Sequence, residues 1–160
     1  MSFDIEGARQ ALYTYCRGVD RLDPELVRAA FWPEAEISLG SIYSGGPEGF
    51  VEVAMGFMGM FAATRHDLAN LLVSADGGYE GYVRTWHWLT DPDRELVVLG
   101  RYLGRAETRD GATRIIAHGE LMDWGEERPV DAGWFRNNAE LEKGRRDRED
   151  ASYRWVASRT

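Results

Sequence analysis

The sequence predicts a single domain of the α+β class, in which helices near the N-terminus cover one face of an antiparallel sheet. Residues 4–61 place apolar side chains mainly at helical spacing, whereas residues 64–124 form long runs typical of strands. Short turns rich in Gly and Asp separate those runs, as in hairpins. Helices followed by antiparallel strands are typical of this class. A chain of 160 residues fits one domain, which we expect at residues 1–136, followed by a charged tail or helix at 137–160.

Two helices are expected at the start of the chain. Apolar residues recur at helical spacing over residues 4–19, which predicts an amphipathic helix. Asp23 is a candidate N-cap for a second helix, since a proline follows it at the first helical position. That helix should end near Phe31, because the Trp32-Pro33 pair disfavours helical backbone before the proline.

A strand, a third helix and four long strands should follow. Residues 36–39 alternate polar and apolar side chains, as a half-buried strand does. Residues 45–48 combine two Gly, a Pro and a Glu, which indicates a turn and a helix start. The third helix contains three Met and two internal Gly, so we expect it to be adaptable. The long strands are expected at residues 64–76, 79–90, 95–109 and 113–124.

Composition excludes several classes of partner. The net charge of −8 argues against nucleic acid and against an anionic membrane surface, which both require concentrated Lys and Arg. No apolar run approaches the length of a spanning helix, and the N-terminus has no signal-peptide core. The single cysteine, Cys16, cannot form an internal disulfide. We therefore expect a cytoplasmic protein.

A sheet with helices on one face leaves a cone between the two layers, where a ligand can bind. Aromatic residues make up 12% of the chain, including six Trp, which favours an aromatic-lined cavity. Proposed wall residues are Phe31, Trp32, Tyr43, Met55, Met58, Tyr102 and either the Trp86/Trp88 pair or His87, which point to opposite faces of one strand.

In the segment ALYTYCRGVDRLDPELVRAAFWPEAEI, an expected helix ends in an Asp and a short second helix follows. This segment resembles the opening of proteins of the SnoaL-like, nuclear-transport-factor-2-like superfamily. ATRHDLANLLVSADGGYEGYVRTWHW resembles their second and third strands, with Thr-x-His and an Asn four residues after the His. GRYLGRAETRDGATRIIAHGELMDW resembles their final hairpin. The resemblance covers most of residues 5–125 and implies a cone-shaped α+β barrel, a curved sheet wrapped by helices around a pocket.

Within this superfamily the arrangement is most similar to scytalone dehydratase and hexachlorocyclohexane dehydrochlorinase. Their Asp at the end of the first helix matches Asp20, and their His at the start of a strand matches His66. The resemblance implies that this pair removes a proton and that no cofactor or metal takes part. Some family positions differ, because Leu39 falls near a pocket tyrosine of scytalone dehydratase, and Gly100 and Tyr102 fall near its Ser and Asn. The resemblance therefore extends to the Asp–His pair but does not indicate the same substrate.

The residues themselves also favour a base without a nucleophile. His66 and Asn70 share one strand face by the two-residue period. A carboxylate on one ring nitrogen would leave the other nitrogen as a directed base, although the residues alone favour a surface histidine beside Asp67 over this interpretation. Cys16 has no adjacent base in the sequence. The sequence also contains no Gly-x-Ser-x-Gly nucleophile elbow, no Gly-rich phosphate loop and no His-x-x-Glu or Cys-x-x-Cys spacing of metal ligands.

The remaining candidates are substrate-binding residues. Tyr102 could orient a substrate oxygen or be an ordinary core aromatic. His118 is expected to be structural. The full set of proposed substrate contacts is Tyr102, Tyr43, Trp88, His87, Phe31, Trp32, Met55 and Asn70.

Two classes of function remain open at this level. The first is a cofactor-independent lyase for a small hydrophobic, preferably aromatic molecule, catalysing dehydration, another β-elimination or retro-aldol cleavage, with isomerisation as a related option. The second is a non-catalytic ligand-binding or dimerising adaptor. In either case we expect self-association as a dimer or trimer, because helices can cover only one face of the sheet.

Overall fold

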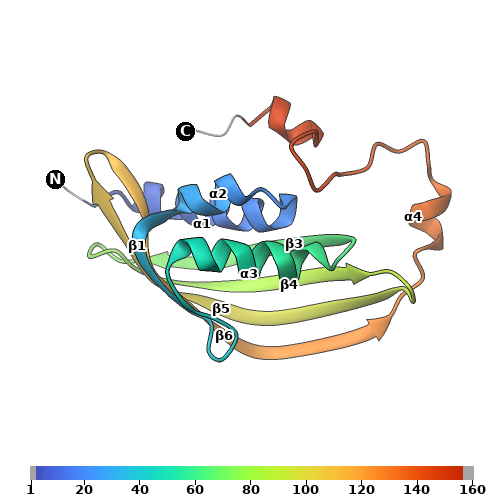
Figure 1. The fold of residues 1–160 in the computed structure, drawn as a ribbon, viewed down its shortest axis with the longest axis horizontal. Helices are drawn as coiled ribbons and strands as arrows, with labels where there is room; N and C mark the ends of the chain where they lie inside the picture. The colour runs from blue at the N-terminus through green and yellow to red at the C-terminus, as the bar shows by residue number, and fades with distance from the viewer. Residues whose placement is uncertain (1–2, 157–160) are drawn as a thin grey trace.

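The computed structural model describes residues 3–156 and contains one curved, six-stranded sheet with helices on one face (Figure 1). The elements in chain order are α1 (Ile5–Arg21), α2 (Pro24–Ala30), β1 (Phe31–Ser38), β2 (Ser44–Gly45), α3 (Pro47–Gly59), β3 (Ala63–Val73), β4 (Gly78–Leu89), β5 (Arg94–Arg109), β6 (Ala112–Pro129), α4 (Gly133–Asn137) and a short 3-10 turn, Ala151–Arg154. The strand order is β2-β1-β6-β5-β4-β3, and only β1 and β6 pair in parallel. The expected α+β class is confirmed.

The first helix forms where the apolar periodicity predicts it. Asp4 caps α1, because its carboxylate accepts a hydrogen bond from the backbone N–H of Gly7. The helix ends at Leu22, whose backbone has a left-handed conformation with φ of 50°. Asp20 therefore lies in the last helical turn, one turn beyond the buried Cys16.

The second helix has the N-cap expected from the sequence. The Asp23 carboxylate accepts hydrogen bonds from the backbone N–H groups of Glu25 and Leu26. The α2 helix stops at Ala30, and the chain continues directly into β1. The helix thus ends before the proline at position 33, as predicted. The strand was expected to begin at residue 36 but begins five residues earlier, at Phe31. The pairing of β1 with β6 is interrupted between Phe31 and Glu36, so the missing N–H of that proline breaks no regular ladder.

The four long strands form the predicted meander. The final strand, β6, continues to Pro129, beyond the expected end at residue 124, because β5 pairs with it along its whole length. The edge strand β3 has an irregularity between Ala69 and Leu72, where Asn70 adopts a positive φ of 46°. This bulge changes which residues of β3 face the helices.

The apolar core lies between the helices and one end of the sheet. Its fully buried side chains include Leu12 of α1, Phe31 of β1, Phe50 of α3 and Tyr102 of β5. The strands β4 to β6 continue past the end of α3, and α4 lies at that far end (Figure 1). Residues 120–129 of β6 are accordingly exposed. No helix among residues 3–156 is long and apolar enough to cross a membrane.

Candidate active site

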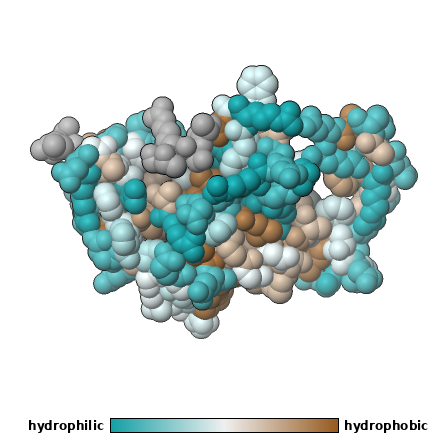
Figure 2. All heavy atoms as spheres, turned by 45° about the horizontal axis from the view of Figure 1, so that its top comes forward, coloured by the Kyte–Doolittle hydropathy of each residue, from teal (hydrophilic) through white to brown (hydrophobic). Residues whose placement is uncertain are grey.

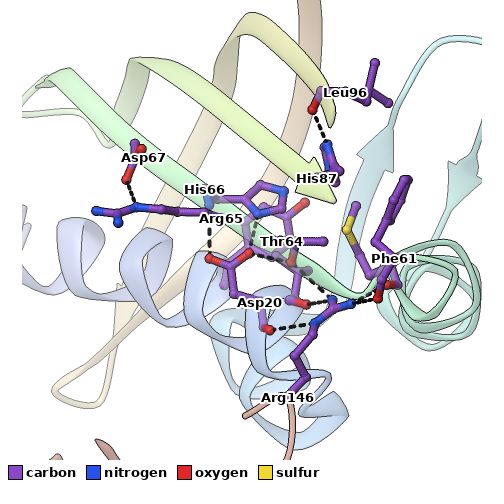
Figure 3. A network of polar contacts seen from close by, with 12 residues as sticks. Asp20, Phe61, Thr64, Arg65, His66, Asp67, His87, Leu96 and Arg146 are labelled. Carbon is purple, nitrogen blue, oxygen red and sulfur yellow. Dashed lines mark hydrogen bonds and ion pairs between the residues drawn. The ribbon is translucent and has the colours of Figure 1, made fainter. Parts of the chain in front are cut away.

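The end of α1 and the start of β3 bring the two predicted catalytic residues together. Nδ1 of His66 lies 2.7 Å from Oδ1 of Asp20, although the two residues are 46 positions apart (Figure 3). The side chain of His66 is 4% exposed and that of Asp20 is 13% exposed. This short, buried contact between a helix end and an edge strand is fixed by the packing of the fold, unlike an ion pair on the surface.

The Asp20 carboxylate accepts three hydrogen bonds. The donors are the imidazole of His66, the backbone N–H of His66 at 3.0 Å and the Thr64 hydroxyl at 2.9 Å. Burial by itself raises the pKa of Asp20, but the hydrogen bonds and charge of His66 and the bond from Thr64 outweigh it and hold the pKa below its ordinary value. Asp20 is thus ionised and can only accept hydrogen bonds near neutral pH.

This protonation state determines the tautomer of His66. Because the carboxylate can only accept, Nδ1 of His66 must carry the proton and donate it. The other ring nitrogen, Nε2, forms no hydrogen bond with any of the residues the structure describes. Its lone pair is available to take a proton from a bound molecule, which is the arrangement of a general base.

A second histidine lies beside the pair. The ring of His87 meets that of His66 edge-on, with 5.8 Å between the centroids, and packs against Phe61 on its other side. Burial and, to a smaller extent, the nearby His66 lower the pKa of His87 to about 4. Nδ1 of His87 lies 3.3 Å from the Leu96 carbonyl oxygen. His87 is therefore a neutral, buried neighbour of the base.

A groove of about 1030 Å³ runs along the edge strand β3 and reaches both residues of the pair. Tyr13 and Arg17 of α1 line one side, and Trp86, Trp88 and Phe135 form an aromatic end. Trp88 thus lies at the groove, on the face of β4 opposite to His87. Figure 2 shows hydrophobic side chains near the centre of this face, with hydrophilic ones around them. The aromatic-lined cavity expected inside the cone is replaced by a groove open to solvent along the edge strand β3.

Most of the other proposed wall residues do not line this groove. Phe31 and Tyr102 are fully buried core residues, and Tyr43, Met55 and Met58 pack against that core. These side chains line no cavity because α1 and α3 pack closely on the near half of the sheet and their apolar residues fill the space between the layers.

Two further expectations of placement, for Trp32 and Asn70, are corrected, and the structure decides between His87 and the two indoles. Trp32 does not line the groove, and its ring is stacked by the guanidinium groups of Arg109 and Arg114. Asn70 is exposed at the bulge of β3, which removes it from the face of His66. The ring of His87 lies on the side of the sheet where His66 points, whereas the indoles of Trp86 and Trp88 lie on the opposite side, and the groove has lining residues on both sides of the edge strand.

His118 is buried in a different cluster, with Nδ1 at 2.8 Å from the Tyr79 hydroxyl. Burial raises the pKa of the Cys16 thiol, so Cys16 is not a thiolate nucleophile near neutral pH. Among residues 3–156, no group of three or more His, Cys, Asp and Glu side chains is arranged to hold a metal ion.

Two residues that contact the pair were not predicted. Thr64 lies two positions before His66 on the same face of β3, so the strand period alone could have suggested it. Arg146 comes from the C-terminal tail, defined here as residues 137–156, and donates to the backbone carbonyl of Asp20 at 3.1 Å (Figure 3). The separation of 126 positions left no local pattern from which this contact could be inferred.

The fold and the site together define a cone-shaped α+β domain with a buried Asp–His pair at the edge of its sheet. The sequence matches the family model of the SnoaL-like domain over residues 2–119, and the chain belongs to this family. A comparison with curated protein sequences finds no match.

Solved structures with the same fold include a candidate scytalone dehydratase and hexachlorocyclohexane dehydrochlorinases. One is a candidate scytalone dehydratase from Novosphingobium aromaticivorans, with a TM-score of 0.69 and 18% identity over 79% of this chain and 89% of that one. Another is the type 3 hexachlorocyclohexane dehydrochlorinase of Novosphingobium barchaimii, with a TM-score of 0.65 and 25% identity over 80% and 90% of the two chains. A type 2 dehydrochlorinase is 26% identical, with a TM-score of 0.65, over 79% of this chain and 88% of that one.

Proposed function

We propose that this protein is a cofactor-independent lyase in which His66 is the general base. The observation that carries the proposal is the buried hydrogen bond between His66 and the ionised Asp20, beside a groove large enough for a small molecule. An adaptor has no need of such a pair, and a solvent-exposed His66 would have favoured that alternative.

The proposed step is a proton abstraction coupled to elimination. Nε2 of His66 takes a proton from the carbon next to the one that bears the leaving group, and the C–H electron pair forms the new double bond as the leaving group departs with its own pair. Asp20 stabilises the imidazolium that results, while its hydrogen bond keeps the ring in place. A positioned base of this kind contributes about 10²–10⁴ in rate.

The same base accommodates related reactions. Dehydration and loss of halide differ only in the leaving group, and retro-aldol cleavage begins with a proton taken from a hydroxyl. The names of the structural relatives, a scytalone dehydratase and hexachlorocyclohexane dehydrochlorinases, favour elimination over the others. Return of the proton to another carbon would give an isomerase on the same fold.

The aromatic end of the groove favours a small hydrophobic substrate. Trp86, Trp88 and Phe135 offer ring faces and edges within one wall. A flat ring or a halogenated ring fits this lining better than a flexible polar chain does. We therefore propose substrates that carry a ring, with the leaving group next to an acidic C–H.

The test is a screen of hydroxylated and halogenated cyclic compounds against the wild type and the His66→Gln variant, read by mass spectrometry. Loss of water or of hydrogen halide by the wild type alone supports the proposal, and a product of unchanged mass points to isomerisation. Equal product formation by a folded His66→Gln variant would exclude His66 as the base.

A further inference from the structure

Arg146 inserts its side chain into the junction where α1 and α3 end and β3 begins. A guanidinium has five N–H donors, and each of them has a partner here. The acceptors are the carbonyl oxygens of Val19, Asp20, Met58 and Phe61 and the hydroxyl of Thr64, at 2.6–3.3 Å. A side chain with all of its donors in use is held in a single orientation.

The charge of Arg146 also suits this position. The C-terminal ends of α1 and α3 both present backbone carbonyl groups and the negative end of a helix dipole. Asp20 adds a carboxylate at the end of α1, where an anion is otherwise unfavourable. The guanidinium thus compensates a site that the two helix ends and Asp20 make strongly negative.

The contact with Thr64 gives this cation a direct link to the pair. The Thr64 hydroxyl has one proton, and its oxygen accepts from Nη2 of Arg146 at 3.1 Å. The hydroxyl proton is therefore directed to Oδ1 of Asp20, at 2.9 Å (Figure 3). The same oxygen faces Nδ1 of His66. Arg146 thus donates to Thr64, and Thr64 donates to the same Asp20 oxygen that receives the hydrogen bond from His66.

We propose that Arg146 is a positioning residue of the Asp–His pair, acting through Thr64 to keep Asp20 aligned and His66 in its Nδ1–H tautomer. The proposal deepens the assigned function, on which its catalytic meaning rests. It also gives the C-terminal tail a role, since this segment lies beyond the part of the chain that matches the family model.

The same segment contains a matched control. Arg148 also fastens the tail to the helices, through hydrogen bonds to the buried Asp23 carboxylate at 3.0 and 3.1 Å. The Tyr153 hydroxyl binds Asp23 as well, at 2.7 Å. Arg148 touches neither Thr64 nor Asp20 among its hydrogen bonds and ion pairs. Replacing Arg148 therefore weakens the attachment of the tail without removing the hydrogen bonds from Arg146 through Thr64 to Asp20.

The decisive experiment reads the ring nitrogens of His66 by long-range proton–nitrogen NMR at neutral pH, on the protein without substrate. The variants are Arg146→Gln, Thr64→Val and Arg148→Gln, with the His66 signals assigned by their loss in His66→Gln. We expect the Nδ1–H tautomer in the wild type and in Arg148→Gln, and a mixture of tautomers in Arg146→Gln and Thr64→Val. The Nδ1–H tautomer retained in folded Arg146→Gln and Thr64→Val would overturn the proposal.

A second variant tests the proposal if Arg146→Gln does not fold, and a kinetic measurement tests it once a substrate is known. If Arg146→Gln fails to fold, Arg146→Lys keeps the charge but cannot supply five donors, so it should show the same mixture. Once a substrate is identified, Arg146→Gln should lower kcat about 10–100-fold and change KM little, because a misplaced base slows the chemical step. If the variants change the tautomer of His66 but the wild type converts none of the screened compounds, the lyase proposal is contradicted. The positioning role of Arg146 is supported all the same.

Discussion

The hydrogen bond between Nδ1 of His66 and Oδ1 of Asp20 joins the last turn of α1 to the first residues of the edge strand. Because Asp20 also receives the backbone N–H of His66, the carboxylate holds both the ring and the strand that carries it. The geometry of the base thus depends on how the first helix packs against β3.

The two residues should behave as one unit in kinetics. His66→Ala removes the base, and Asp20→Asn removes the charge that stabilises the imidazolium, so each change should lower turnover by about 10²–10⁴. The double variant should be little worse than His66→Ala alone, because either change disables the same step. Turnover rates of the three variants provide the measurement, and strictly multiplicative losses would mean that the residues act separately.

The buried His87 should make stability depend on pH. Its pKa is about 4 in the folded chain and near 6.5 in the unfolded chain, so only the unfolded chain binds a proton between these values. Stability should therefore fall as the pH drops through this window, by about 3 kcal/mol in total. His87→Phe cannot bind the proton and should flatten the fall, which urea unfolding at pH 7, 6 and 5 would measure. The same slope in both proteins would show that another group causes it.

The N-cap of α2 should matter more for stability than that of α1. Asp23 is 2% exposed and also binds Arg148 and Tyr153, so Asp23→Ala should destabilise the protein by about 2–4 kcal/mol. Asp4 caps α1 from an exposed position, and Asp4→Ala should cost about 1 kcal/mol. Thermal or chemical unfolding of the two variants gives the comparison, and an equal loss would mean that the contacts with the tail add nothing.

The outer face of the sheet should mediate self-association. Leu99, Leu121 and Trp124 lie together on the side opposite Tyr102 and are 40%, 45% and 49% exposed. Such an apolar group on a sheet face favours a dimer or trimer. Light scattering of the wild type at micromolar concentration should therefore give a multiple of the 18.1 kDa chain mass, and Leu121→Glu should reduce it. A wild-type monomer would exclude this interface.

Local signals in the sequence determined the elements of this fold. The cap at Asp23, the helical spacing of α1 and the turns between the long strands each depend on residues a few positions apart, so they could be interpreted without a structure. The pair of Asp20 and His66 came from the resemblance to the SnoaL-like family, and its distance is now given by the packing of α1 on β3.

The tertiary structure decided which residues surround that pair. Composition predicted aromatic walls, but it could not show that Phe31 and Tyr102 fill the core while Trp86 and Trp88 face an open groove at the sheet edge. The charge-rich tail was expected to be a solvated helix or a mobile segment, yet Arg146 reaches the helix ends and Thr64. Contacts between residues this distant in sequence form only after the layers have packed, because the carbonyl groups that bind Arg146 are brought together by helix ends that meet only in the folded chain.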